Sequence, residues 1–192
     1  SATPQKTSEE LRDGTPVKMG KEAEIASALC RKAMAGGHID RGIEHANDAV
    51  ADKPKWSQAH LLLAQAYFAR VAIAERTIKP LKAEDRDSSL AQSLSVADDA
   101  IFAAESEGVQ YVRAQALALK SDIALLQGHK DDAARFARDS FGADPTDLNG
   151  RLALAQSFFS MGKPDEGIAV LDDAYTPSNS APHVRFHPMN AP

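Results

Sequence analysis

The sequence predicts an all-α protein made of repeated helical hairpins. Its composition favours helices, because alanine is abundant while aromatic residues make up only 6% of the 192 residues. Glycine-marked turns recur along the chain, and small or apolar residues follow each turn at the spacing of one helical stripe. With 43% apolar and 26% charged residues, the chain has enough apolar side chains to bury a core.

Three segments, 36–54, 127–145 and 161–179, align as copies of one unit. Each starts at a turn glycine and has a small residue five positions later; these pairs are Gly37 and Gly42, Gly128 and Ala133, and Gly162 and Gly167. The last two turn glycines are 34 residues apart. A second helical pattern precedes each glycine, over residues 23–36, 114–127 and 147–161. Each unit is therefore predicted to be a helix, a glycine turn and another helix.

One further unit is longer than the others. A first helix is indicated by residues 60–67, and the small-residue stripe of a second helix by Ala97, Ile101 and Ala104. The intervening segment includes Pro80 and a charged run from Lys82 to Asp87. We expect two prolonged helices that meet at a polar loop near residues 79–88.

The 34-residue unit resembles the tetratricopeptide repeat (TPR) family. The second helices match the family well, and Tyr67 and Phe158 keep an aromatic residue of its first helix. The family's large early residue is replaced by Ala26, His60, Leu117 and Arg151, and its close-packing glycine by Cys30, Ala64, Ser121 and Ala155. The resemblance implies a superhelical array of about four helical hairpins, the second with elongated helices.

The chain is expected to have three parts. Residues 1–20 form an N-terminal arm, and residues 21–176 form the repeat domain, with units at about 23–56, 57–110, 114–147 and 148–176. Residues 177–192 form a proline-rich C-terminal tail. A solenoid usually ends in a polar capping helix, and none is indicated after Tyr175. The outer face of the last repeat is therefore expected to be covered by the tail or by another molecule.

Several classes of function receive no support from the sequence. The net charge is −5 and no basic run is present, which argues against nucleic acid as a partner. No apolar stretch approaches the roughly 20 residues of a membrane span. No phosphate loop, nucleophile motif or zinc-protease motif occurs, so we predict no enzyme activity and no cofactor. His183 and His187 have the spacing of a metal pair, but flanking prolines disfavour a helix there, and no metal site is predicted.

The TPR resemblance implies that the first helices line a concave groove for a protein or peptide. Carried over by register, the groove residues are Arg31, Met34, Leu61, Gln65, Phe68, Gln115, Asp122, Asn149, Leu152, Gln156 and Phe159. An alternative interpretation places Phe68 and Phe159 in the core between repeats. Relatives that grip a C-terminal carboxylate use basic and amide residues where this chain has Ser27 and Arg31, then Ala118 and Asp122. That carboxylate clamp is therefore missing.

The leading hypothesis is a protein- or peptide-binding scaffold or adaptor within a larger assembly. The alternative is a structural repeat protein that forms homo-oligomers through its uncapped C-terminal repeat and tail. The acidic balance disfavours a third hypothesis, RNA binding by a related helical-repeat fold. The single cysteine, Cys30, is expected in the core as a small hydrophobic residue. The compartment stays open, because both a cytoplasmic and an exported protein fit the sequence.

Overall fold

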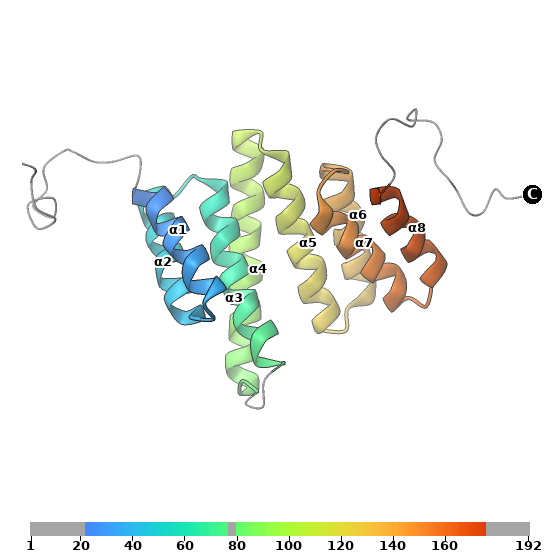
Figure 1. Ribbon diagram of the computed structural model, residues 1–192, viewed down its shortest axis with the longest axis horizontal. Coiled ribbons are helices and arrows are strands. Elements are labelled where there is room, and N and C mark those ends of the chain that lie inside the picture. Colours follow the sequence, from blue (N-terminus) through green and yellow to red (C-terminus); the bar gives the residue numbers. More distant parts are fainter. Residues whose placement is uncertain (1–21, 77–79, 176–192) are drawn as a thin grey trace, which may run out of the picture.

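The computed structural model describes residues 22–76 and 80–175. Within these ranges the chain forms eight α-helices and no strand. The helices follow one another along the long axis of the molecule (Figure 1). Their bounds are α1 (Glu22–Ala35), α2 (Ile39–Asp52), α3 (Ser57–Ala74), α4 (Ala83–Glu107), α5 (Gln110–Leu126), α6 (Lys130–Ala143), α7 (Leu148–Ser160) and α8 (Pro164–Tyr175).

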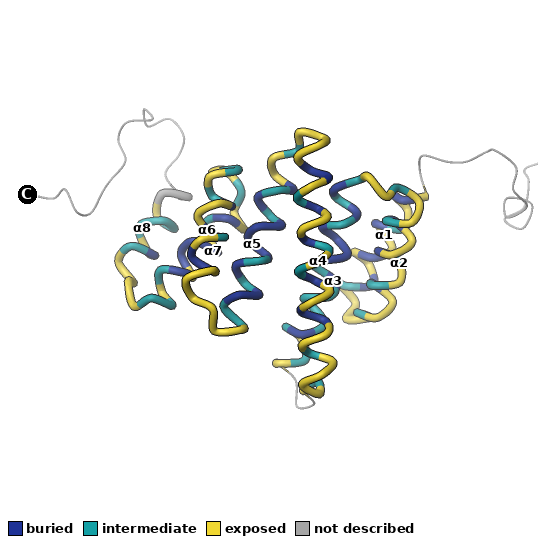
Figure 2. The backbone as a smooth tube through the Cα atoms, turned by 180° about the vertical axis from the view of Figure 1, so that it is seen from behind, coloured by how far each residue is buried: buried dark blue, intermediate teal, exposed yellow. Residues whose placement is uncertain are grey.

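The helices form four hairpins, and the predicted all-α array is confirmed. Each helix packs against the next in sequence, and the first helices α1, α3, α5 and α7 also contact one another from unit to unit. Buried residues concentrate in the middle of the array, on α3, α4 and α5, whereas the helices at both ends are more exposed (Figure 2). The arrangement is quasi-one-dimensional, because each unit contacts only its neighbours.

The predicted turn glycines end three of the first helices. Gly37, Gly128 and Gly162 have φ between 74° and 78°, in the left-handed region where a side chain would be strained. After the first of these turns, the amide of His38 donates to the carbonyl of Ala33 at 2.9 Å, which satisfies a carbonyl at the end of α1. These glycines therefore set where each hairpin reverses direction.

The first, third and fourth hairpins each match a large side chain on the first helix to a small residue on the second. A Cβ added to Gly42 would lie 2.7 Å from the sulfur of Met34, and one added to Gly167 would lie 2.6 Å from the ring of Phe159. The third hairpin has Leu125 and Ala133 at the same two positions. Glycine thus accompanies the bulkier methionine and phenylalanine, while alanine accompanies leucine. The recurring small residues seen in the sequence are there to admit these side chains.

The second hairpin is elongated as predicted, with helices of 18 and 25 residues. Its end extends beyond the neighbouring hairpins (Figure 1). The predicted loop at 79–88 is too long, because α4 already begins at Ala83. Glu84 and Asp85 occupy its first turn, where carboxylates complement the helix dipole. A charged run that suggested a loop is therefore the start of a helix.

The core lies between successive units. Leu62 and Leu63 of α3 pack against Cys30 and Ala46 of the first hairpin. Equivalent clusters join the second hairpin to α5, with Leu90, Leu119 and Ile123 among their members, and the third hairpin to α7. Cys30 is fully buried and its burial raises the pKa of the thiol, so the core prediction for this residue is confirmed.

Buried serines connect helices at positions where the backbones lie close together. The Ser93 hydroxyl donates to the Ala64 carbonyl at 2.8 Å, Ser121 to Ala133 at 2.8 Å, and Ser140 to Ala114 at 2.7 Å. The acceptors lie on neighbouring helices, so each bond fixes one helix against another. A small hydroxyl residue combines close approach with a satisfied hydrogen bond.

The only tryptophan of the chain lies at the first junction between units. Trp56 immediately precedes α3 and packs with Ala23, Ala49 and Ala59, which come from α1, α2 and α3. The ammonium of Lys53 lies 5.4 Å from the centre of the indole ring, within the range of a cation–π contact. The tryptophan thus joins the first hairpin to the second.

Candidate functional site

The two central first helices, α3 and α5, pack against a preceding and a following unit. On α3, Ala59, Leu62 and Leu63 face the preceding unit, while Leu61 and Ala64 pack with residues of α4 and α5. In the same way, α7 uses Ala153 and Leu154 to contact the preceding unit. The remaining side, away from the second helix of the hairpin, is the candidate surface for a ligand.

This arrangement corrects part of the predicted groove. Leu61 is only 3% exposed and packs with Ala100, Val112 and Ala116, so it belongs to the junction between the second and third units. Ser27 and Ala118, which follow the same register, are also buried. This register position is therefore buried in the first three hairpins.

The other predicted apolar residues make contacts between helices. Met34 packs over Gly42, and Phe68 lies against the core cluster that contains Leu90. Leu152 and Phe159 occupy the register of Leu61 and Phe68 in the last unit, where no further repeat follows within the described residues. They are 40% and 43% exposed. Their exposure therefore reflects the end of the array.

The polar members of the predicted set are the ones exposed or half-buried on the first helices. They occupy two register positions that are seven residues, about two helical turns, apart. We define the polar row as Arg31, Gln65, Gln115, Asp122, Asn149 and Gln156, together with Gln58. Gln58 was missed by sequence reasoning, although it has the same register as Gln115 and Asn149.

The polar row points away from the second helices. On α5, the Ser121 hydroxyl reaches Ala133 of α6, whereas Gln115 and Asp122 project about 100° or more away from it on the helical wheel. Two of the amides are positioned by neighbouring units. Gln115 donates to Asp147 at 2.9 Å, and Gln58 accepts from the Tyr111 hydroxyl at 3.1 Å. The row therefore crosses several units of the array.

Asp122 is the unusual group in the polar row. It is half-buried on α5, and no described residue forms a hydrogen bond or an ion pair with its carboxylate. Burial raises its pKa to about 6. A carboxylate that is desolvated without a partner costs stability when it ionises, and it is prepared to pair with a cation.

Asp122→Asn is expected to stabilise the protein at neutral pH. An aspartate with a pKa of about 6 in the folded chain and roughly 3.9 in the unfolded chain destabilises the fold as the pH rises through this window. The substitution should raise the free energy of unfolding at pH 7.5 by on the order of 1–3 kcal/mol. The gain should shrink toward pH 4, where the folded aspartate is already protonated. Urea unfolding at several pH values measures it.

Asp139→Asn is the matched control, because Asp139 is an exposed aspartate on α6. This change should alter the free energy of unfolding by no more than about 0.5 kcal/mol, at pH 7.5 as well as near pH 4. An equal, pH-independent gain from Asp122→Asn and Asp139→Asn would contradict the assignment of a raised pKa to the groove carboxylate.

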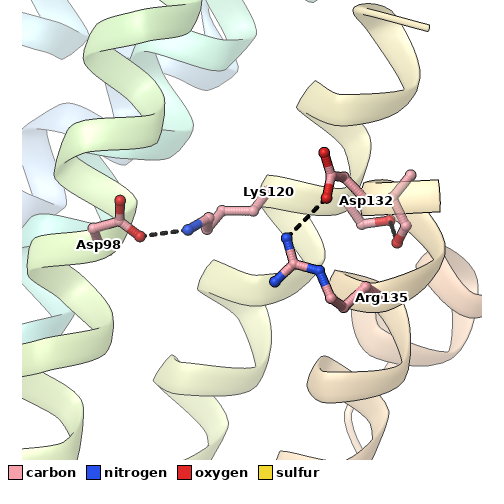
Figure 3. Close-up of polar contacts among 6 residues, drawn as sticks. Asp98, Lys120, Asp132 and Arg135 are labelled. Atoms are coloured by element: carbon pink, nitrogen blue, oxygen red, sulfur yellow. Dashed lines mark hydrogen bonds and ion pairs between the residues drawn. The ribbon is translucent and has the colours of Figure 1, made fainter. Parts of the chain in front are cut away.

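The opposite face of the array, formed by the second helices, carries a small charged cleft. Lys120 of α5 pairs with Asp98 of α4, and Arg135 pairs with Asp132 at 2.8 Å on α6 (Figure 3). Both cations lie within 4.6 Å of the centre of the Phe136 ring. Lys120 occupies the register position that Leu63 and Leu154 hold in other units. At the junction between the second and third units, a charged residue therefore stands where the other two junctions have leucine.

A larger cleft of about 600 Å³ lies between the 54–55 loop and the second half of α4. One of its two acidic residues, Glu107, is already occupied, because it accepts hydrogen bonds from the backbone amide and hydroxyl of Ser57. His60 contacts the carbonyl of Pro54 at 2.8 Å. Glu107 and His60 therefore make their contacts at the start of α3, and Lys55 and Asp99 are the other titratable residues that line the cleft.

The histidines do not form a metal centre in the part of the chain that the structure describes, where no cluster of three metal-ligating side chains occurs. His38 and His129 precede α2 and α6 at equivalent positions. His183 and His187 lie outside the described residues. No helix in the ranges 22–76 and 80–175 is long and apolar enough to cross a membrane.

Two other proteins are among those whose solved structures are similar to this chain. The crystal structure of TTC0263, a thermophilic TPR protein in Thermus thermophilus, has a TM-score of 0.67 and 25% sequence identity, over 86% of this chain and 77% of TTC0263. The crystal structure of MamA has a TM-score of 0.56 and 16% identity, over 86% of this chain and 81% of MamA. No protein-family model matches the sequence, and no curated protein matches it.

Proposed function

We propose that this chain, which has the TPR fold, is a scaffold that binds an extended peptide segment of a partner protein along the polar row. The fold supports a role in protein–protein interaction in general. The observation that carries the finer proposal is the alignment of carboxamides and one unpaired carboxylate along the first helices, at exposed or half-buried positions directed away from the second helices.

Carboxamides suit recognition of a peptide backbone. A glutamine or asparagine side chain offers both a donor and an acceptor, and an extended peptide presents alternating amides and carbonyls. Gln65 and Gln156 occur at the same register position in the second and fourth units, with Asp122 between them in the third. Such spacing lets one peptide contact successive units.

Asp122 supplies the chemical preference of the site. Its carboxylate is half-buried and lacks a described partner, so a lysine or arginine of the peptide would gain a charge-assisted hydrogen bond. The proposed ligand is therefore a peptide with a basic side chain at its centre. A C-terminal carboxylate is a poor ligand, because Ser27 and Ala118 are buried where a carboxylate clamp would need exposed side chains.

Binding is tested with peptides selected from a random library on the full chain and then measured by calorimetry. The selected peptides should be enriched in lysine or arginine. We expect Asp122→Asn to weaken binding about tenfold or more. Gln156→Ala should change the affinity by about fivefold through the loss of one hydrogen bond, and Arg31→Ala should change it by about fivefold through the loss of a nearby charge. Affinity should fall below pH 6, as the carboxylate becomes protonated.

Gln92→Ala is the matched control, because Gln92 is an exposed glutamine on α4, a second helix. It should leave affinity unchanged. Equal affinities for the chain, the Asp122→Asn variant and the Gln156→Ala variant would rule out the polar row as the binding site.

A further inference from the structure

We infer that copies of this chain associate head to tail, with α1 of one copy docking on the outer side of α7 and α8 of the next. This association is separate from peptide binding and does not rest on it. The inference follows from the repeat register. Successive units of the chain pack together at three internal junctions, and the two surfaces that form such a junction are both exposed at the ends of the array.

The first half is the outer side of α1, called here the front edge. Its residues are Ile25, Ala28, Leu29 and Lys32. By register they correspond to Gly150, Ala153, Leu154 and Ser157 of α7, which are buried against the preceding unit. On α1 no unit precedes them within the described residues, and Ile25 and Leu29 are 57% and 42% exposed. The front edge thus has the apolar character of a junction that lacks its partner.

The second half is the outer side of the last hairpin, called here the rear edge. Its residues are Leu148, Leu152, Phe159, Ile168 and Leu171. The corresponding positions of the third hairpin, such as Ala118 and Ala137, are buried against Ala153 and Leu154 of α7. On the last hairpin, Leu148 is 58% exposed and Ile168 is 50% exposed. Two apolar edges of this kind are unusual on a monomer that remains alone in water.

The internal junctions show how the two edges would meet. At the junction of the third and fourth units, Ala153 and Leu154 pack against Ala118 and Ala137. The same register places Ala28 and Leu29 of one copy against Leu152 and Leu171 of its neighbour. The aliphatic stem of Lys32 can lie along this junction while its ammonium reaches water.

A second copy explains both edges with one interface. Residues 176–192 directly follow α8 and are an alternative cover for the rear edge within one chain. Residues 1–21, which directly precede α1, would have to cover Ile25 and Leu29 of the front edge separately, so two different covers would be needed. Docking of copies buries the front edge of one and the rear edge of the other, and it continues the junction geometry already present between units.

The contact joins two different surfaces, so it is heterologous. Every assembly that does not close into a ring therefore keeps one free front edge and one free rear edge. The expected product is an open series of oligomers whose mean mass rises with concentration. A dimer formed by two identical edges would instead stop at two copies.

Two single-edge variants of the full chain test the inference by sedimentation velocity over a wide concentration range. Ile25→Glu places a charge on the front edge, and Leu152→Glu places one on the rear edge. We expect the unchanged chain to form oligomers and each variant alone to stay monomeric. An equimolar mixture should form a dimer and nothing larger, because one intact front edge then meets one intact rear edge.

Phe102→Glu is the control, because Phe102 is 74% exposed on α4 and belongs to neither edge. It should assemble like the unchanged chain, and all variants should keep the helical circular dichroism and melting temperature of a folded chain. The inference is overturned if the unchanged chain is monomeric at every concentration, if Ile25→Glu still assembles, or if the mixed variants remain monomers.

Discussion

Leu90→Ala is expected to lower the free energy of unfolding by about 2–5 kcal/mol, the cost of emptying a fully buried leucine site. Leu90 is 0% exposed and lies in the cluster that joins α3, α4 and α5. The neighbouring side chains, including Val71 and Ile123, come from rigid helices and can fill the space only in part.

The position of Leu90 makes the effect more than local. In an array stabilised by contacts between neighbouring units, weakening the central junction lets the two halves unfold separately. Urea unfolding followed by circular dichroism should therefore show a lower midpoint and a broader transition for Leu90→Ala. Phe102→Ala, a truncation at a 74% exposed residue that belongs to neither edge, should change stability by no more than about 0.5 kcal/mol. Equal effects of the two substitutions would contradict the central role of this cluster.

Gly150→Ala is expected to lower the free energy of unfolding by roughly 1–3 kcal/mol, although alanine is the better helix former. A Cβ at Gly150 would lie 2.7 Å from the Ser140 hydroxyl oxygen, which is buried and donates to the carbonyl of Ala114. The new methyl group would displace this hydroxyl, so a buried hydrogen bond between α5 and α6 would be lost.

A double-mutant cycle with Ser140→Ala isolates this conflict. Once the hydroxyl is removed, Gly150→Ala should be neutral or should stabilise the chain by up to about 1 kcal/mol through its helix propensity. Thermal and urea unfolding of the four variants measures the coupling. If Gly150→Ala costs the same with serine or alanine at position 140, the damage arises elsewhere in the backbone.

The sequence predicts the hairpins well, because the signals for them are local. Gly37, Gly128 and Gly162 mark turns that only glycine adopts without strain, and the small residues after them show which helix faces must approach closely. The start of α4 was placed too late, because Glu84 and Asp85 favour a helix N-terminus as well as a loop.

The candidate site was predicted in part, and the errors have one physical cause. Helical periodicity places Leu61 and Gln65 close together on one face of α3, but it does not show how much of that face the next unit covers. That depends on contacts between units far apart in sequence, such as those of Leu61 with Ala100 and Ala116. The raised pKa of Asp122 has no local signal either, because it results from burial by the assembled array.

Trp56 has a consequence for how the unfolding of this chain is observed. Its indole lies at the first junction, among residues of α1, α2 and α3. Tryptophan fluorescence therefore reports on the N-terminal end of the array alone, whereas circular dichroism averages over all helices. If α7 and α8 separate first, the emission spectrum stays native while ellipticity is already lost. The difference between the unfolding midpoints seen by fluorescence and by circular dichroism then measures how strongly one end of the array is coupled to the other.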